Sequence, residues 1–138
     1  MKSKISKPLI EIGALPLVVH SLKALSGCSV IKDIIVVANT ANINKIAAKI
    51  KKYKINKIKD IVLGGKRRQD SVYCGLKALG DSTELVLIHD GGRPFIDKKS
   101  ISCAINTAAK YGAAAVGIPM KATVKEVHSP QSMAHGPY

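Results

Sequence analysis

The fold is decided by residues 33–65, which read DIIVVANTANINKIAAKIKKYKINKIKDIVLGG. Two short runs of mostly β-branched residues, 33–38 and 60–63, enclose a lysine-rich segment whose isoleucines recur at helical spacing. Strands that are apolar on both faces are typical of parallel sheets covered by helices. A strand, a helix and a second strand in this order therefore predict a β-α-β unit with a right-handed crossover.

The same alternation continues on both sides of this unit. Leu15, Val18, Val19, Leu22 and Leu25 share one face of an expected helix. Asn42 stands where it could cap the helix expected over 43–53. Further on, the pattern predicts helices over 70–79 and 98–111 and strands over 85–89 and 113–118. No domain boundary is visible, so we expect an α/β fold with one domain over 1–138.

Composition excludes several classes of protein. The chain has 138 residues, 46% of them hydrophobic, and no apolar run reaches the roughly 18 residues of a membrane span. We see no signal peptide. The three cysteines, Cys28, Cys74 and Cys103, lie far apart without a CxxC pair, which argues for reduced thiols in the cytoplasm and against a zinc site.

The net charge of +13 raises the alternative of a basic nucleic-acid-binding module. Seven lysines fall within residues 45–59, interleaved with isoleucines. This pattern is typical of the solvated face of an amphipathic helix. Because the chain has no Trp and a single Phe for stacking on bases, we favour the solvated face and expect no nucleic-acid partner.

Ligands of parallel α/β sheets bind where the strands end. This rule selects Asn39-Thr40, residues 64–71 and residues 89–93. In 64–71 a glycine pair precedes a helix start, which suits an anion or simply forms a capped turn. In 89–93, Asp90 could hold a hydrated Mg²⁺ and Arg93 a phosphate, or the two could form a structural pair.

Three motifs occur in a specific order. They are Gly64-Gly65-x-x-Arg68-Gln69-Asp70-Ser71-Val72-x-x-Gly75-Leu76, His89-Asp90-x-x-Arg93-Pro94-Phe95 and Thr123-x-Lys125-x-Val127. With them, essentially the whole chain resembles the 2-C-methyl-D-erythritol 4-phosphate cytidylyltransferase family. The resemblance implies a Rossmann-like, mostly parallel sheet with helices on both faces. It also implies transfer of CMP from CTP to a sugar-alcohol phosphate with release of pyrophosphate, a Mg²⁺ or other divalent cation, a homodimer and a cytoplasmic location.

The resemblance also implies roles for individual residues. Lys7 would be catalytic, contacting the α-phosphate, and Asp90 would face the ribose, the metal and the substrate. The expected nucleotide-binding residues are Gly65, Lys66, Ser71, Asp90 and Gly91, and the expected substrate-binding residues are Asp90, Arg93 and Thr123. Gly65 and Ser71 would read the cytosine edge, and Lys66 stands where relatives often carry an acid. Arg68 and Asp70 are expected to be structural supports.

The sequence also departs from the family pattern. The glycine-rich loop and the strand that open the family stand before the position of Met1, and the family's later substrate-contacting residues stand after Tyr138. We therefore expect a partial domain without the first strand, and little or no turnover by the chain as written. Ribitol 5-phosphate-type cytidylyltransferases and an inactive fragment are the alternatives within this class.

Overall fold

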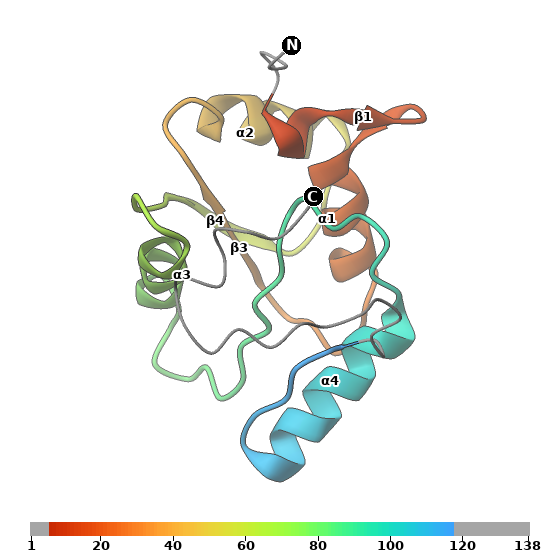
Figure 1. The fold of residues 1–138 in the computed structure, drawn as a ribbon, viewed down its shortest axis with the longest axis vertical. Helices are drawn as coiled ribbons and strands as arrows, with labels where there is room; N and C mark the ends of the chain where they lie inside the picture. Colours follow the sequence, from red (N-terminus) through yellow and green to blue (C-terminus); the bar gives the residue numbers. More distant parts are fainter. Residues whose placement is uncertain (1–5, 118–138) are drawn as a thin grey trace, which may run out of the picture.

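The computed structural model describes residues 6–117, which form a layered α/β arrangement (Figure 1). Helices and strands alternate over most of this range, and a short hairpin precedes the first helix. In chain order the elements are η1 (Lys7–Leu9), β1 (Glu11–Ile12), β2 (Leu15–Pro16), α1 (Leu17–Ser26), β3 (Ile34–Ala38), α2 (Ile43–Lys52), β4 (Ile58–Leu63), α3 (Arg68–Lys77) and α4 (Lys98–Tyr111). Within residues 6–117, no helix combines the length and apolarity needed to cross a membrane.

The centre of the fold is the predicted β-α-β unit. Strands β3 and β4 pair in parallel, with Val36 opposite Ile61 and Ala38 opposite Leu63, and α2 connects them. The expected strands and the helix between them are confirmed, with ends that move by one or two residues. The carboxyl ends of β3 and β4 therefore lie at the same edge of the sheet.

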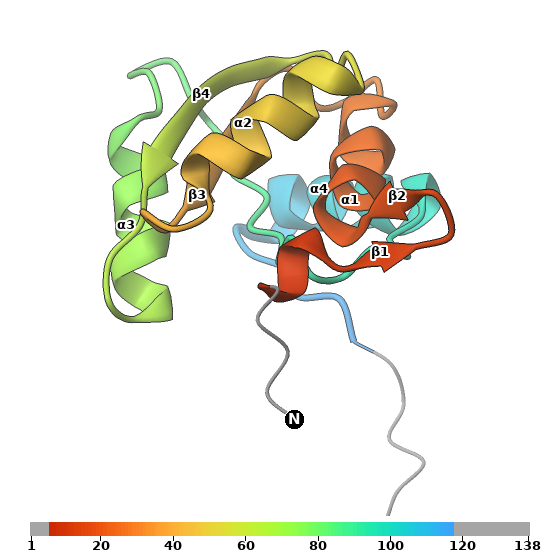
Figure 2. The same cartoon turned by 90° about the horizontal axis from the view of Figure 1, so that it is seen from above.

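Helices cover both faces of this pair. Ile34, Val36 and Ala38 are buried in the main core beside Ile46 of α2 and Val19 of α1. The alternate face of β3 carries Val37, which lies against Gly75 of α3. Figure 2 shows α3 on one side of the strand pair and α2 with α1 on the other. Successive side chains of β3 thus point to opposite faces of the sheet, and each face is covered by a different helix layer, as expected for a Rossmann-like α/β fold.

Helix α1 begins two residues later than its apolar spacing predicts. Leu15 and Pro16 instead form β2, which pairs antiparallel with β1. Gly13 makes the turn between them at a φ of 62°, a left-handed conformation that glycine adopts without steric cost. Proline has no backbone N–H to donate, so Pro16 suits the residue before the first helical turn.

The prediction of strands over 85–89 and 113–118 is wrong for the described residues. A strand exists through hydrogen bonds to a neighbour, and in the part of the chain that the structure describes neither segment pairs with one. Of residues 85–88 only Leu87 is partly buried and packs on the core, while residues 113–117 are exposed. Apolar sequence indicates burial but does not supply a pairing partner. Residue 118 lies outside the described range.

The predicted capping role of Asn42 is also wrong. Asn42 occupies the position before α2, but its side chain makes no cap hydrogen bond. The Asn42 amide donates instead to Ser6 Oγ at 2.7 Å, and the residue is only 7% exposed. This contact ties the start of the described chain to the carboxyl end of β3.

Candidate active site

A pocket of about 380 Å³ opens at the carboxyl ends of β3 and β4. It is bounded by the end of β3, the start of α2, the turn between β4 and α3, and the segment before η1. The residues that line it are Ser6, Pro8, Val37, Ala38, Asn39, Asn42, Ile46, Gly64, Gly65, Lys66, Arg67, Arg68 and Ser71. Two of the three places that the strand-end rule selects therefore meet in one pocket.

The turn between β4 and α3 requires its two glycines. A Cβ on Gly65 would collide with Asp70 Cβ, and one on Gly64 would lie 2.6 Å from Ser71 Oγ. The Ser71 hydroxyl lies 3.3 Å from both the Gly65 and the Arg67 carbonyl oxygens, where it can donate to one of them. Gly65, Lys66 and Ser71 are thus brought together on one wall, as the sequence predicts.

The start of α3 is held by Asp70. Its carboxylate accepts a hydrogen bond from the Arg67 backbone N–H at 3.1 Å and another from the Arg67 guanidinium at 3.0 Å. These bonds hold the pKa of the Asp70 carboxyl below its ordinary value. Asp70 is a support for the turn, in agreement with the expectation.

Asp90 links the second motif to the first. Arg68 Nη2 donates to Asp90 Oδ1 at 2.9 Å, and Arg93 Nε lies 3.2 Å from Asp90 Oδ2. The hydrogen bond from Arg68 holds the pKa of the Asp90 carboxyl below its ordinary value, and the positive charges of Arg68 and Arg93 act in the same direction. Because Arg68 also lines the pocket, the Asp90 loop stands beside it.

The loop that carries Asp90 rests on α1. Ser21 is 1% exposed, and its hydroxyl lies 3.3 Å from the Gly91 carbonyl oxygen and 3.2 Å from that of Arg93. His89 Nε2 donates to the same Arg93 carbonyl at 3.1 Å. Ser21 and His89 therefore hold the backbone of the loop that carries Asp90 and Arg93 in place. His89 has a structural role in this loop.

Lys7 lies close to the same loop. It begins η1, and its Cε would lie 3.5 Å from a Cβ placed on Gly92. The bond between Ser6 and Asn42 holds this segment against the end of β3. The structure therefore brings Lys7, Gly91, Asp90 and Arg93 together near the pocket. Thr123 lies outside the described residues.

The charges around the pocket favour an anionic ligand. Five cationic side chains, those of Lys7, Lys66, Arg67, Arg68 and Arg93, surround or line it, against two carboxylates that are both paired with arginine. Within residues 6–117 no cluster of three or more His, Cys, Asp or Glu side chains could hold a metal by itself. One carboxylate, Asp90, still fits a Mg²⁺ ion that takes its other ligands from phosphates and water.

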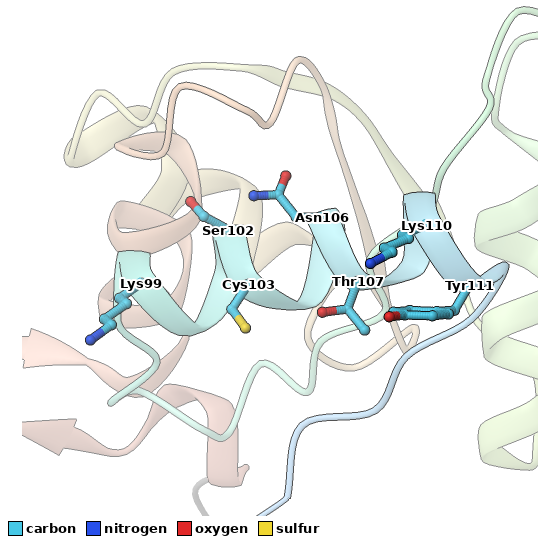
Figure 3. A pocket seen from close by; sticks show the side chains of 7 residues that line it. All are labelled: Lys99, Ser102, Cys103, Asn106, Thr107, Lys110 and Tyr111. Atoms are coloured by element: carbon cyan, nitrogen blue, oxygen red, sulfur yellow. The ribbon is translucent and has the colours of Figure 1, made fainter.

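A second hollow, of about 490 Å³, lies along the outer face of α4 (Figure 3). Its side chains come from this single helix and include Lys99, Cys103 and Tyr111. Lys110 lies over the Tyr111 ring, 5.0 Å from its centroid. Among the residues that line this hollow, no charged pair or group of ligating side chains converges, so the pocket at the sheet edge is the better candidate site.

Sequence reasoning missed three contributors to the site. Arg68 was expected to be only a support, yet it connects the pocket to Asp90. The partners of Ser21 and Asn42 could not be read from the sequence, because each makes its contact with a residue that is distant in sequence. A polar residue on an otherwise apolar helix face is the one feature that could have pointed to Ser21.

Comparison with known proteins gives a consistent result. A family model described as 2-C-methyl-D-erythritol 4-phosphate cytidylyltransferase matches residues 1–137. The protein of that name from Halalkalibacterium halodurans is 41% identical over 127 residues, which cover 92% of this chain and 55% of the relative. The one from Clostridium botulinum strain Loch Maree is 45% identical over 125 residues, covering 91% and 55%. The chain thus spans about half the length of these relatives.

A solved structure is similar as well. The crystal structure of 4-diphosphocytidyl-2C-methyl-D-erythritol synthase from Anaerococcus prevotii superposes with a TM-score of 0.69 at 34% sequence identity. The match covers 78% of this chain and 47% of the other. Both the sequence and the arrangement of the elements are therefore shared with these proteins.

Proposed function

Because the chain belongs to the 2-C-methyl-D-erythritol 4-phosphate cytidylyltransferase family, we propose that it binds CTP and serves the transfer of CMP to 2-C-methyl-D-erythritol 4-phosphate. This reaction belongs to isoprenoid biosynthesis by the non-mevalonate route. The observation that carries the proposal is the contact between Arg68 and Asp90, which joins the two motif segments at the edge of the pocket.

In the proposed reaction, a phosphate oxygen of the acceptor attacks the α-phosphorus of CTP. The bond between the α-phosphorus and the bridging oxygen breaks, and pyrophosphate leaves. Lys7 stands beside the Asp90 loop, where its ammonium can stabilise the charge that develops on the α-phosphate. Arg93 can bind the acceptor phosphate, because a guanidinium matches two phosphate oxygens.

The cytosine would occupy the pocket between β3 and the turn before α3. Gly65 offers backbone groups at close range, since the turn leaves no room for a side chain. The Ser71 hydroxyl lies on the same wall. Lys66 stands exposed at the rim and adds positive charge near the phosphates or the base.

Asp90 would hold the divalent cation, which we propose to be Mg²⁺. A bound Mg²⁺ neutralises charge on the triphosphate. Both Asp90 oxygens currently accept from arginines, so the arginines would turn toward phosphate as the nucleotide and cation enter. We further propose a homodimer in which Arg93 and Thr123 act near the interface, and a cytoplasmic location. The location is supported by three free cysteines, of which one is exposed.

Nucleotide selectivity tests the proposal. With Mg²⁺ present, CTP at about 100 times its Kd should stabilise the chain by about 2.7 kcal/mol, which thermal melting measures as a rise in Tm. ATP and GTP at equal concentration should give a smaller rise. Equal shifts for all nucleotides, or none for CTP, would contradict the proposal.

Lys7→Gln tests the catalytic assignment. Relative to the unmodified chain, whose own rate is expected to be low, pyrophosphate release with CTP and acceptor should fall by about 10² to 10³, because one donor to the transition state is lost. Lys99→Gln, on the outer face of α4, is the matched control and should leave the rate unchanged. If Lys7→Gln keeps the full rate, Lys7 does not act on the α-phosphate.

A further inference from the structure

Lysines are concentrated on α2 and the loop after it. Residues 43–59 contain seven lysines and no Asp or Glu. Lys45 and Lys49 are four residues apart and Lys49 and Lys52 are three apart, spacings at which like charges destabilise a helix by about 0.2–0.5 kcal/mol per pair. A helix face that served only solubility would be more stable with positive and negative side chains interspersed. The concentration of charge therefore calls for another reason.

Three of these lysines are already engaged in the fold. Lys49 pairs with Glu11 at 3.6 Å and Lys59 with Asp33 at 3.8 Å. Lys57 donates to the carbonyl oxygens of Cys28 and Ile31, at 2.7 and 2.8 Å. The remaining exposed lysines of this face have no carboxylate within 4.0 Å among the described residues. We call them, together with the neighbouring Lys23, the lysine surface: Lys23, Lys45, Lys51, Lys52 and Lys54.

The lysine surface is organised by ordered backbone and by one aromatic ring. The ammonium groups of Lys23 from α1 and Lys52 from α2 lie 5.8 and 5.3 Å from the centre of the Tyr53 ring. Lys54 is fixed at a φ of 50°, and its N–H donates to the Lys51 carbonyl at 3.2 Å. Charges from two helices are thus gathered around Tyr53 before any partner arrives.

Most of the lysine surface lies away from the pocket, and Lys45, in the first turn of α2, is its one member close to the pocket-lining residues. Asn42 and Ile46, at the beginning of α2, line the pocket, whereas Lys51 and Lys52 are at the end of this ten-residue helix. Ten residues of helix span about 15 Å. Figure 2 shows α2 lying along the strand pair with α1 beside it. A partner on the lysine surface therefore leaves the pocket accessible.

The composition of the surface selects its partner. Among residues 17–62, which include α1 and α2, Val30 is the single exposed large apolar side chain. This disfavours a membrane, where a binding helix inserts several apolar residues. Lysine is depleted from protein–protein interfaces. Lysine binds phosphate as a point charge and lacks the planar fork with which arginine binds two acceptors at once. We propose that the lysine surface binds the phosphate backbone of nucleic acid without reading its sequence. This differs from the expectation drawn from the few aromatic residues, because contacts to phosphates need no stacking on bases.

The test measures how fluorescent oligonucleotides of about 20 nucleotides, one duplex DNA and one single-stranded RNA, bind to the 138-residue chain. Binding is followed by fluorescence anisotropy between about 50 and 200 mM NaCl, the range over which phosphate contacts weaken. Binding should be independent of sequence and should fall steeply with salt. The triple variant Lys51→Gln, Lys52→Gln, Lys54→Gln should weaken binding by about tenfold or more and lower the salt slope by about 3. Saturating CTP should leave the affinity unchanged.

The matched control is Lys98→Gln, Lys99→Gln, Lys110→Gln, which removes the same charge from exposed positions on α4. It should stay within about threefold of the unmodified chain if the lysine surface is the site. If both triple variants weaken binding equally, then binding depends on the net charge of the chain and not on the lysine surface, and the proposal is overturned. Binding to anionic lipid vesicles but not to oligonucleotides would overturn it too, as would competition by CTP.

Discussion

At the scale of single residues, the site depends on a carboxylate shared between two guanidinium groups. Asp90 receives Arg68 from the start of α3 and Arg93 from its own loop. The three side chains together carry one positive charge, so the group as a whole attracts phosphate while Asp90 stays ionised. An entering anion can therefore recruit either arginine without leaving the carboxylate unpaired.

Arg68→Gln should raise the pKa of Asp90 toward its ordinary value, because the hydrogen bond from Arg68 is the main cause of the lowered pKa. NMR titration of the Asp90 carboxyl measures this change. Since the folded pKa lies below the unfolded one, the pair stabilises the fold above about pH 4 and loses this contribution as pH falls through the folded value. Arg68→Gln should therefore flatten the acid branch of the stability curve.

Arg67→Gln is the control for this experiment. Arg67 holds Asp70 in the same way that Arg68 holds Asp90. Its loss should raise the pKa of Asp70 and leave that of Asp90 in place. If Arg68→Gln does not move the Asp90 titration, the two segments are not joined in solution.

Individual residues could be predicted from the sequence where a motif marks them. Gly65 and Ser71 follow the end of β4, and Asp90 and Arg93 follow the segment 85–89 that the pattern wrongly predicts as a strand, yet the structure brings all four together. The pairing of Arg68 with Asp90 could not be predicted, because a long surface arginine side chain can reach many acceptors and the sequence does not show which one is near. Whether Asp90 binds a metal and whether Lys7 is catalytic remain predictions.

At the scale of elements, the contact between α1 and the Asp90 loop sets the geometry of the site. Ser21 is the only polar side chain among the buried residues of α1, and it reaches two loop carbonyls. Ser21→Ala should lower the free energy of unfolding by about 1 kcal/mol, because the single hydroxyl proton that one of these part-buried carbonyls accepts is lost. Urea denaturation measures this loss, and hydrogen exchange should show faster exchange at the Arg93 amide.

Ser26→Ala is the matched control on the same helix. Its hydroxyl reaches only the Lys23 carbonyl of the last turn, at 3.4 Å. The change should cost less than about 0.5 kcal/mol and leave the Arg93 amide unaffected. Equal costs for the two variants would mean that the loop does not depend on Ser21.

Elements were predictable to the extent that local pattern specifies them. The periodicity of 33–65 gave both strands and α2, and α4 occurs over the predicted residues. The hairpin before α1 was not predicted, because strands of two residues carry no periodic signal. Residues 85–89 were assigned wrongly because a strand depends on its neighbour, which local pattern cannot show.

At the scale of the whole molecule, positive charge exceeds negative charge by 13. Self-repulsion of this size destabilises the compact state. Raising NaCl from about 10 to about 200 mM should therefore raise the Tm by a few degrees, because salt shortens the range of repulsion. Thermal melting at fixed pH measures the effect, and an unchanged or lower Tm would show that the surface ion pairs outweigh the repulsion.

Helix α1 supports two parts of the molecule at once. Val19 and Leu22 belong to the central core, while Val18 and Ser21 support the Asp90 loop, with a Val18 methyl 3.7 Å from where a Gly91 Cβ would be. A stable core and a correctly placed Asp90 loop therefore depend on the same helix. A substitution in α1 that repacks the core should also shift the loop, so these two segments should change together between related proteins.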